Sequence, residues 1–167
     1  GDVYKRQVQE VEGFRRDVRV VNLSLLAGDW YIDQMKRKAY ESDGVPISFT
    51  KDQYHAGVRD FVTIEERTQQ SFSMKEVMEF VASDRPETKS NRYQGGPVDY
   101  IPTRNLYIPV DKEEVLANGT VQPEDSALIV DRVEIQLKGS SLNKSQLMVL
   151  DILATNNWER PVYFGVG

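Results

Sequence analysis

The 167-residue chain contains no cysteine and a single histidine, His55. The lack of cysteine excludes disulfides, thiolate metal ligands and a thiol nucleophile. One histidine cannot build a multi-histidine metal site. The sequence also lacks an apolar stretch of about 20 residues that could cross a bilayer, a Gly-rich phosphate loop, a nucleophile elbow and a kinase signature. These absences predict no metal, no cofactor and no catalytic centre built from a known motif.

The charges present are balanced and dispersed. Lys and Arg number 21 against 26 Asp and Glu, which gives a net charge of −5. No basic stripe occurs, so we expect no nucleic acid as a partner. The length fits one domain that can bury a sizeable core.

Both ends of the chain suggest a fragment. Residues 1–7 resemble translated sequencing-adapter residues and are predicted to be non-native, with a native exposed segment as the alternative. Residues 162–167 stop inside an expected strand. We therefore interpret residues 8–167 as a single soluble α/β domain truncated at both ends.

Two helix-and-strand units near the ends predict the fold. Val18–Leu25 is apolar on both faces, as in a central parallel strand, and leads through Gly28 into a helix that Asp29 is expected to cap. A mostly apolar helix, Leu147–Thr155, leads into a second strand at Val162–Phe164. The expected fold is therefore α/β, with a mostly parallel, Rossmann-like sheet and flanking helices.

The middle of the chain carries clear local signals. Capping boxes begin helices at Ser73–Glu76 and at Asn143–Gln146. Residues 83–102 are rich in Pro, Gly, Asn and Asp and predict a long irregular insertion. Further expected elements are a short helix at 8–14, strands at 59–64, 106–110 and 132–138, and a helix capped by Asp111.

Asn22, Asp29 and Trp30 are the first candidate site residues. Asp29 and Trp30 follow the expected first strand, and α/β sheets bind ligands beyond the carboxyl ends of their strands. There Trp30 could stack on a sugar or lipid head group while the helix N-terminus faces its phosphate. The alternative, which we favour, is that Asp29 caps, Trp30 packs in the core and Asn22 satisfies local backbone groups.

Asn156, Asn157, Trp158 and Arg160 are the second candidate group. They precede an expected strand, so they would lie at the opposite edge of a parallel sheet from Asp29. One crevice cannot then hold both groups, and the first group is the stronger candidate. A helix C-terminus explains the asparagines without a function. His55 beside Tyr54 is more simply an exposed loop residue than a general base.

Several blocks of the chain resemble domain-of-unknown-function family 2723. The blocks are residues 10–26, 29–36, 47–54, 105–110 and 153–164. Members of this family are large bacterial membrane proteins, frequent in Bacteroidetes and similar to transmembrane protein 260, a protein O-mannosyltransferase. This chain resembles their soluble region. A polar Gly-Asp-Asn-Asp-Thr-Tyr-Pro-like segment that family members carry before residue 10 is matched here only at Gly1-Asp2.

The resemblance implies a location and a set of partners. The parent would carry a membrane domain of the lipid-sugar-dependent glycosyltransferase type, followed by this domain on the extracytoplasmic, periplasmic side. The partners would be that membrane domain and a lipid-linked sugar or acceptor protein. The catalytic acid would lie in the membrane domain, so we expect the isolated chain to be inactive. A non-catalytic scaffold of the envelope is the rival, and the missing phosphate loop disfavours a stand-alone Rossmann-like enzyme.

Overall fold

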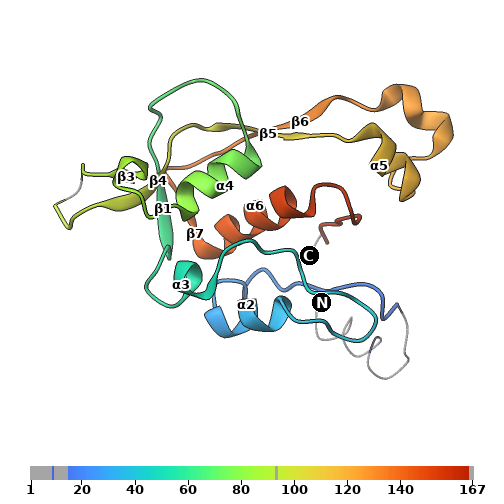
Figure 1. Ribbon diagram of the computed structural model, residues 1–167, viewed down its shortest axis with the longest axis horizontal. Helices are drawn as coiled ribbons and strands as arrows, with labels where there is room; N and C mark the ends of the chain where they lie inside the picture. The colour runs from blue at the N-terminus through green and yellow to red at the C-terminus, as the bar shows by residue number, and fades with distance from the viewer. Residues whose placement is uncertain (1–8, 10–14, 93, 166–167) are drawn as a thin grey trace.

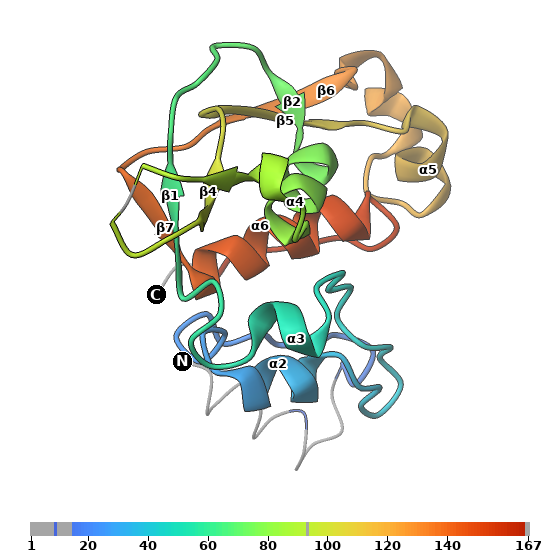
Figure 2. The same cartoon turned by 60° about the vertical axis from the view of Figure 1, so that its left-hand side comes forward.

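The computed structural model describes residue 9, residues 15–92 and residues 94–165. The predicted non-native segment 1–7 and, apart from Gln9, the predicted helix at 8–14 lie outside these residues. Figures 1 and 2 show helices α4 and α6 against the strands, with α2 and α3 on the far side of α6. Helix α6 therefore lies at the centre of the molecule.

A four-stranded mixed sheet forms one part of the core. Its order is β3 (Lys89–Ser90), β4 (Val98–Ile101), β1 (Phe61–Ile64) and β7 (Ser141–Asn143). Strand β1 runs parallel to β4 and antiparallel to β7, with Thr63 in register with both Tyr100 and Ser141. Strand β3 pairs antiparallel with β4.

A three-stranded sheet leads into an arm that extends from the body in Figure 1. Its order is β2 (Phe72–Ser73), β5 (Asn105–Pro109) and β6 (Arg132–Gln136). The connection between β5 and β6 holds helix α5 (Lys112–Ala117) and the 3₁₀ helix η2 (Pro123–Leu128). Asp111 caps α5 by accepting from two backbone amides, as the sequence predicts.

The capping boxes place the two core helices where the sequence predicts them. Helix α4 (Met74–Ala82) begins at Ser73, and helix α6 (Lys144–Asn156) begins at Asn143, each with a complete capping box. Four apolar residues of α4 are buried, and α6 is buried on several faces. This agrees with the near-ideal helical period of the first and the almost wholly apolar sequence of the second.

Residues 15–58 form a separate layer under α6, in which the helix predicted after Gly28 is present but the predicted strand is not. Val18–Leu25 is irregular backbone that turns at residues 23–25 instead of a strand. The Asn22 Oδ1 accepts the Ser24 N–H at 2.9 Å, which folds the backbone locally, and Leu23 is 48% exposed. Helices α2 (Asp29–Met35) and α3 (Lys51–Tyr54) complete the layer.

The α/β class is confirmed, but the sheets are mixed rather than mostly parallel and Rossmann-like. Val162–Phe164 forms no strand and is exposed, so it cannot pair with Val18–Leu25 as predicted. The predicted insertion at 83–102 contains β3, the interior strand β4 and the 3₁₀ helix η1 (Pro86–Thr88). The short Val-Asp-Tyr-Ile run of β4 lies among turn residues, which hid it from the sequence prediction.

Candidate functional site

An open depression of ≈ 820 Å³ lies where three segments meet. The segments are the turns before α2 with the first residue of that helix, the loop between α3 and β1 with the first residue of that strand, and the N-cap and first turn of α6. Figure 2 shows that α6 is the only one of these that belongs to the central layer. The lining residues are Leu23, Ser24, Ala27, Gly28, Asp29, Ala56, Asp60, Phe61, Asn143, Lys144, Ser145 and Gln146.

A lysine–aspartate pair holds the loop against the first turn of α6. The Lys144 Nζ donates to Asp60 Oδ1 at 2.5 Å and to the His55 carbonyl at 3.1 Å. The Lys144 side chain is only 2% exposed, whereas that of Asp60 is 52% exposed. Because its ammonium is already hydrogen-bonded on the protein side, Lys144 positions the wall of the depression and offers no free cation to a ligand.

A second ionic cluster fixes α2 to α3 beside the depression. The Lys51 Nζ lies 2.5 Å from Asp33 Oδ2 and 3.5 Å from Asp29 Oδ2, and the Tyr54 hydroxyl donates to Asp33 Oδ1 at 2.6 Å. Lys51 and Tyr54 hold the pKa of Asp33 below its ordinary value, while burial and Asp33 raise the pKa of Tyr54. The carboxylates of Asp29 and Asp33 are therefore ionised, and their contacts with Lys51 and Tyr54 orient α2 against α3.

Asp29 lines the depression and Trp30 lies beside it. Asp29 does not cap α2 and Trp30 does not pack in the core, although the sequence favoured both of these structural roles. The N-cap of α2 is Gly28, and Asp29 accepts from the N–H of Trp30, which lowers the pKa of Asp29. Trp30 is 58% exposed, so it is no core residue. Its indole lies back against Gly28, next to the depression. Asn22 has the expected structural role, because it closes a local turn and its N–H donates to Tyr31.

The second predicted group lies at the other end of α6. At 1.5 Å per residue, that end is about 18 Å from Lys144. Asn157 is a left-handed C-cap, and Asn156 Nδ2 donates to the Arg160 carbonyl at 2.7 Å. The Trp158 Nε1 donates to the Pro109 carbonyl, and Arg160 Nη2 donates to the Gly44 carbonyl. These side chains tie α6 to the arm and to the layer below it.

Sequence reasoning missed the residues that define the depression most clearly. Phe61 is 74% exposed although it belongs to strand β1, and Asp60 and Lys144 pair across 84 residues of sequence. An exposed aromatic side chain at a strand end is visible only in three dimensions. His55 is exposed and its Nδ1 lies 3.0 Å from the Ala56 carbonyl, while Tyr54 points to Asp33, so the two do not form a general-base pair.

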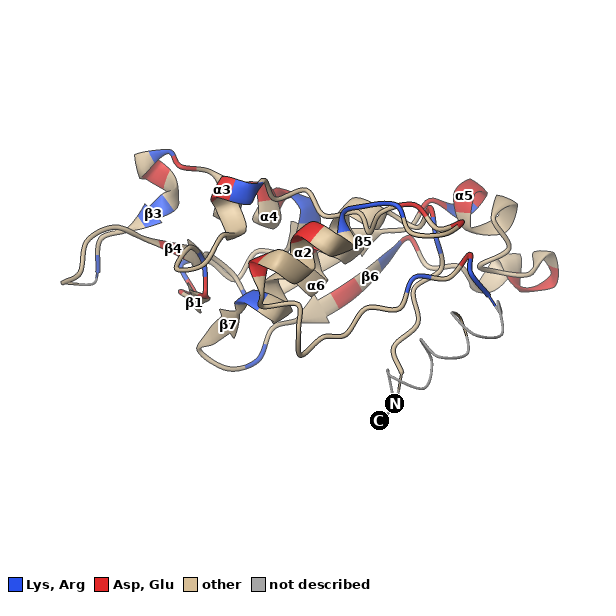
Figure 3. Ribbon diagram, turned by 90° about the horizontal axis from the view of Figure 1, so that it is seen from below, with Lys and Arg blue, Asp and Glu red and all other residues tan. Residues whose placement is uncertain are grey.

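The depression offers apolar surface beside amide and hydroxyl groups. Within residues 15–92 and 94–165, no group of three or more His, Asp or Glu side chains could hold a metal ion. Over the same residues, no helix is both long and apolar enough to pass through a membrane. Figure 3 shows acidic and basic residues interspersed along the ribbon of the described residues.

Comparison with known proteins identifies the family. Residues 6–167 match the family described as TMEM260-associated domain 2. The chain belongs to this family. The match covers nearly the whole chain and supports the resemblance to transmembrane protein 260. No curated protein and no solved structure matched the chain. Within TMEM260-associated domain 2, the depression at the first turn of α6 is therefore assigned from its geometry alone.

Proposed function

We propose that this domain is the extracytoplasmic part of a membrane-bound, glycosyltransferase-like bacterial protein of the family-2723 type, and that it presents the acceptor polypeptide to the membrane domain. Membership of TMEM260-associated domain 2 supports the relation to transmembrane protein 260. In this proposal the transfer step, of a sugar from a lipid carrier to protein, takes place in the membrane domain. The soluble domain binds and orients the acceptor.

The observation that carries the proposal is the character of the depression. Its wall is largely apolar, with Leu23, Ala27 and Phe61 facing it, while amides and hydroxyls gather at the first turn of α6. An extended polypeptide supplies both apolar side chains and backbone groups for such a wall. A lipid-linked sugar phosphate fits less well, because Lys144, the single basic residue among the described lining residues, is already paired with Asp60.

The test is glycosylation by the full-length parent protein in its membrane. Phe61→Glu places a charge in the depression, and Leu128→Glu is a matched control, because both side chains are about three-quarters exposed and apolar. We expect Phe61→Glu and Trp30→Ala to raise the KM for the acceptor at matched folded abundance, and Leu128→Glu to have no effect. Unchanged acceptor glycosylation in both test variants would remove the depression from the proposal.

One observation favours the rival function of a non-catalytic scaffold in the bacterial envelope. Leu128, Val130 and Val133 are exposed together on the arm, at 77%, 55% and 36%. Exposed apolar side chains in sequence proximity suit a contact with another protein. If the parent protein transfers no sugar and Leu128→Glu disrupts an envelope complex, the scaffold function is the correct one.

A further inference from the structure

Two buried side-chain oxygen atoms, one in strand β1 and one just after it, lack hydrogen-bond partners among the described residues. They are Thr63 Oγ1 and Glu65 Oε1. The Glu65 side chain is 4% exposed, and its other oxygen, Oε2, accepts from Arg67 Nε and Nη2 at 3.0 and 2.8 Å. Burial acts to raise the pKa of Glu65, but hydrogen bonds of its carboxylate with the Ser90 and Arg67 side chains hold that pKa below its ordinary value. An unpartnered buried acceptor costs about 1–3 kcal/mol, so its persistence at two nearby positions requires an explanation.

The two atoms share one face of the sheet with an aromatic ring. Thr63 is in register with Tyr100 of the parallel strand β4, and Glu65 lies two residues beyond Thr63. Side chains two residues apart on a strand, and side chains in register on neighbouring strands, point to the same face. The Arg67 guanidinium carbon lies 4.1 Å from the centroid of the Tyr100 ring, and Arg67 Nη2 also donates to Ser90 Oγ at 3.1 Å.

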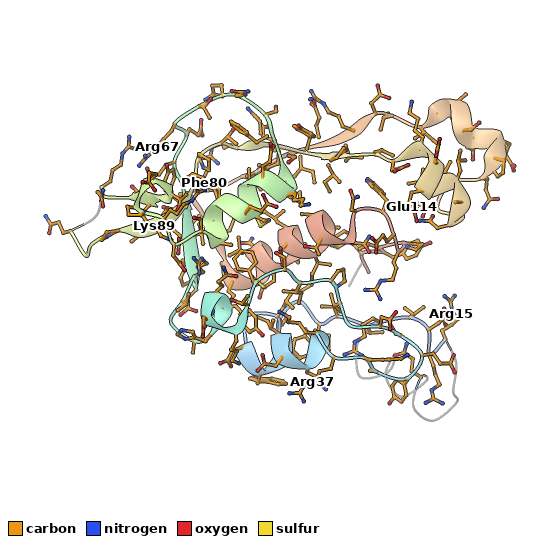
Figure 4. All side chains as sticks on the ribbon, viewed as in Figure 1. Arg15, Arg37, Arg67, Phe80, Lys89 and Glu114 are labelled. Carbon is orange, nitrogen blue, oxygen red and sulfur yellow. The ribbon has the colours of Figure 1, made fainter. Side chains whose placement is uncertain are left out.

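Two arginines form the solvent side of this cluster. The side chain of Arg67 is 38% exposed and that of Arg92 is 69% exposed, with Arg92 Nε 3.7 Å from Glu65 Oε2. Figure 4 shows Arg67 at the end of the molecule that also carries Lys89 and Phe80. The Phe80 ring packs edge-on against Tyr100 at 5.2 Å. The cluster thus has exposed arginine donors at its mouth, two buried acceptors without hydrogen-bond partners among the described residues at its base, and an aromatic ring under Arg67.

The charges select the class of ligand. Two guanidinium groups at the mouth disfavour a cation, and a bare carboxylate oxygen at the base disfavours an anion. A hydroxyl group both donates and accepts, so a neutral polyhydroxyl ligand can satisfy the base and the mouth together. An aromatic ring adds an apolar face of the kind on which a sugar ring can pack.

We propose that Thr63, Glu65 and Tyr100 form a carbohydrate-binding site, which the Arg67 side chain covers in this structure. Ligand entry moves Arg67 off the Tyr100 ring. Ligand hydroxyls then donate to Thr63 Oγ1 and Glu65 Oε1, and the arginines donate to ligand oxygens. The site shares no residue with the depression at α6, and it stands whether or not the domain presents an acceptor polypeptide.

The experiment is a ¹⁵N NMR titration of the full chain with methyl glycosides of common hexoses. We expect at least one glycoside to shift the Arg67 Nε–H and the Thr63 and Tyr100 amides. Thr63→Val should weaken this binding about tenfold and at the same time raise Tm, because it removes a buried hydroxyl that lacks a partner. Glu79→Gln, an exposed change on α4, should alter neither quantity.

Ligand-side controls separate the proposal from its alternatives. A permethylated glycoside keeps its acceptor oxygens but has no hydroxyl donors, so it should not bind, and inorganic phosphate should not bind. A serine peptide carrying the same sugar distinguishes a protein-linked glycan from a free saccharide by its tighter binding. The proposal is overturned if no hexose glycoside shifts these signals, if the permethylated form binds equally well, or if Thr63→Val lowers Tm and leaves binding intact, as a site for buried water alone would give.

Discussion

The contact between Ser48 and Asp151 tests how the lower layer is held to α6. Asp151 lies within α6 and is fully buried. Its Oδ2 accepts the Ser48 N–H at 2.7 Å, and its Oδ1 accepts the Ser48 hydroxyl at 2.5 Å. Thr155 Oγ1 is a more distant donor at 3.4 Å. Ser48→Ala removes only the hydroxyl donor and keeps the backbone donor in place.

The expected loss follows from the charge and the burial of the acceptor. A hydrogen bond to a charged group contributes about 1.5–3 kcal/mol. Ser48 reaches the surface, so water can replace part of its hydroxyl bond and the lower end applies. We expect Ser48→Ala to lower the free energy of unfolding by about 1.5 kcal/mol, which corresponds to a Tm decrease of about 3–6 °C for a domain of this size.

The loss should depend on pH, with a sign fixed by Asp151. Burial raises the pKa of Asp151 above its ordinary value of 3.8, and the Ser48 hydrogen bonds offset part of the rise. The folded state therefore binds the proton more tightly than the unfolded state, and this group's contribution to stability falls as pH rises from about 3.8 through the folded-state pKa. Ser48→Ala raises that pKa further, so its deficit should be small at low pH and larger near neutrality.

Urea denaturation of wild type and Ser48→Ala, from low pH to neutrality, measures how the difference in their free energies of unfolding depends on pH. Ser126→Ala, an exposed serine in η2, is the matched control and should stay within about 0.5 kcal/mol of wild type. In an Asp151→Asn background, Ser48→Ala should cost only a neutral hydrogen bond, about 1 kcal/mol or less, at every pH. A deficit in the wild-type background that is the same at all pH values would refute the assignment of Asp151 as the charged acceptor.

Three further substitutions test local geometry. Asn143→Ala removes the N-cap of α6, whose Oδ1 accepts from Gln146 N, and should cost about 1 kcal/mol in urea denaturation; no change would mean that the cap is not formed. Gly44→Ala should unfold or strongly destabilise the domain, because an added Cβ would lie 2.2 Å from the Lys36 carbonyl oxygen. Gly95→Ala is the control and should be tolerated, because nothing lies within 4 Å of its Cβ position. Equal Tm values for the two glycine variants would contradict this packing.

Elements governed by short-range chemistry could be predicted from the sequence. The boxes Ser73–Glu76 and Asn143–Gln146 place α4 and α6 correctly, because a side-chain cap is satisfied by amides only three residues away. Asp111 caps α5 for the same reason. The alternation of residues 132–138 also gives a strand, β6, that pairs with β5.

Elements whose state depends on distant partners could not be predicted. Val18–Leu25 has the composition of a central strand, yet the amide of Asn22 closes a turn and Arg19 Nη2 donates to the Gln34 carbonyl of α2. Strand β4 is the opposite case, because its sequence predicts irregular structure and the segment forms a strand. Its sequence is short and lies among turn residues, but β1 on one side and β3 on the other satisfy its backbone. Tertiary pairing decided both segments against their local preference.

The candidate sites also depend on tertiary contacts that the sequence does not reveal. Asp29 was predicted from the rule that ligands bind beyond strand ends, but the strand is absent and Asp29 still lines the depression. It does so because the turn before α2 and the first turn of α6 line the same depression, an arrangement that no local pattern encodes. Thr63 and Glu65 look like ordinary strand residues in the sequence, and only their burial without partners distinguishes them. Natural proteins depart from full polar satisfaction chiefly at functional positions, so this departure is the reason to test the sheet face as well as the depression.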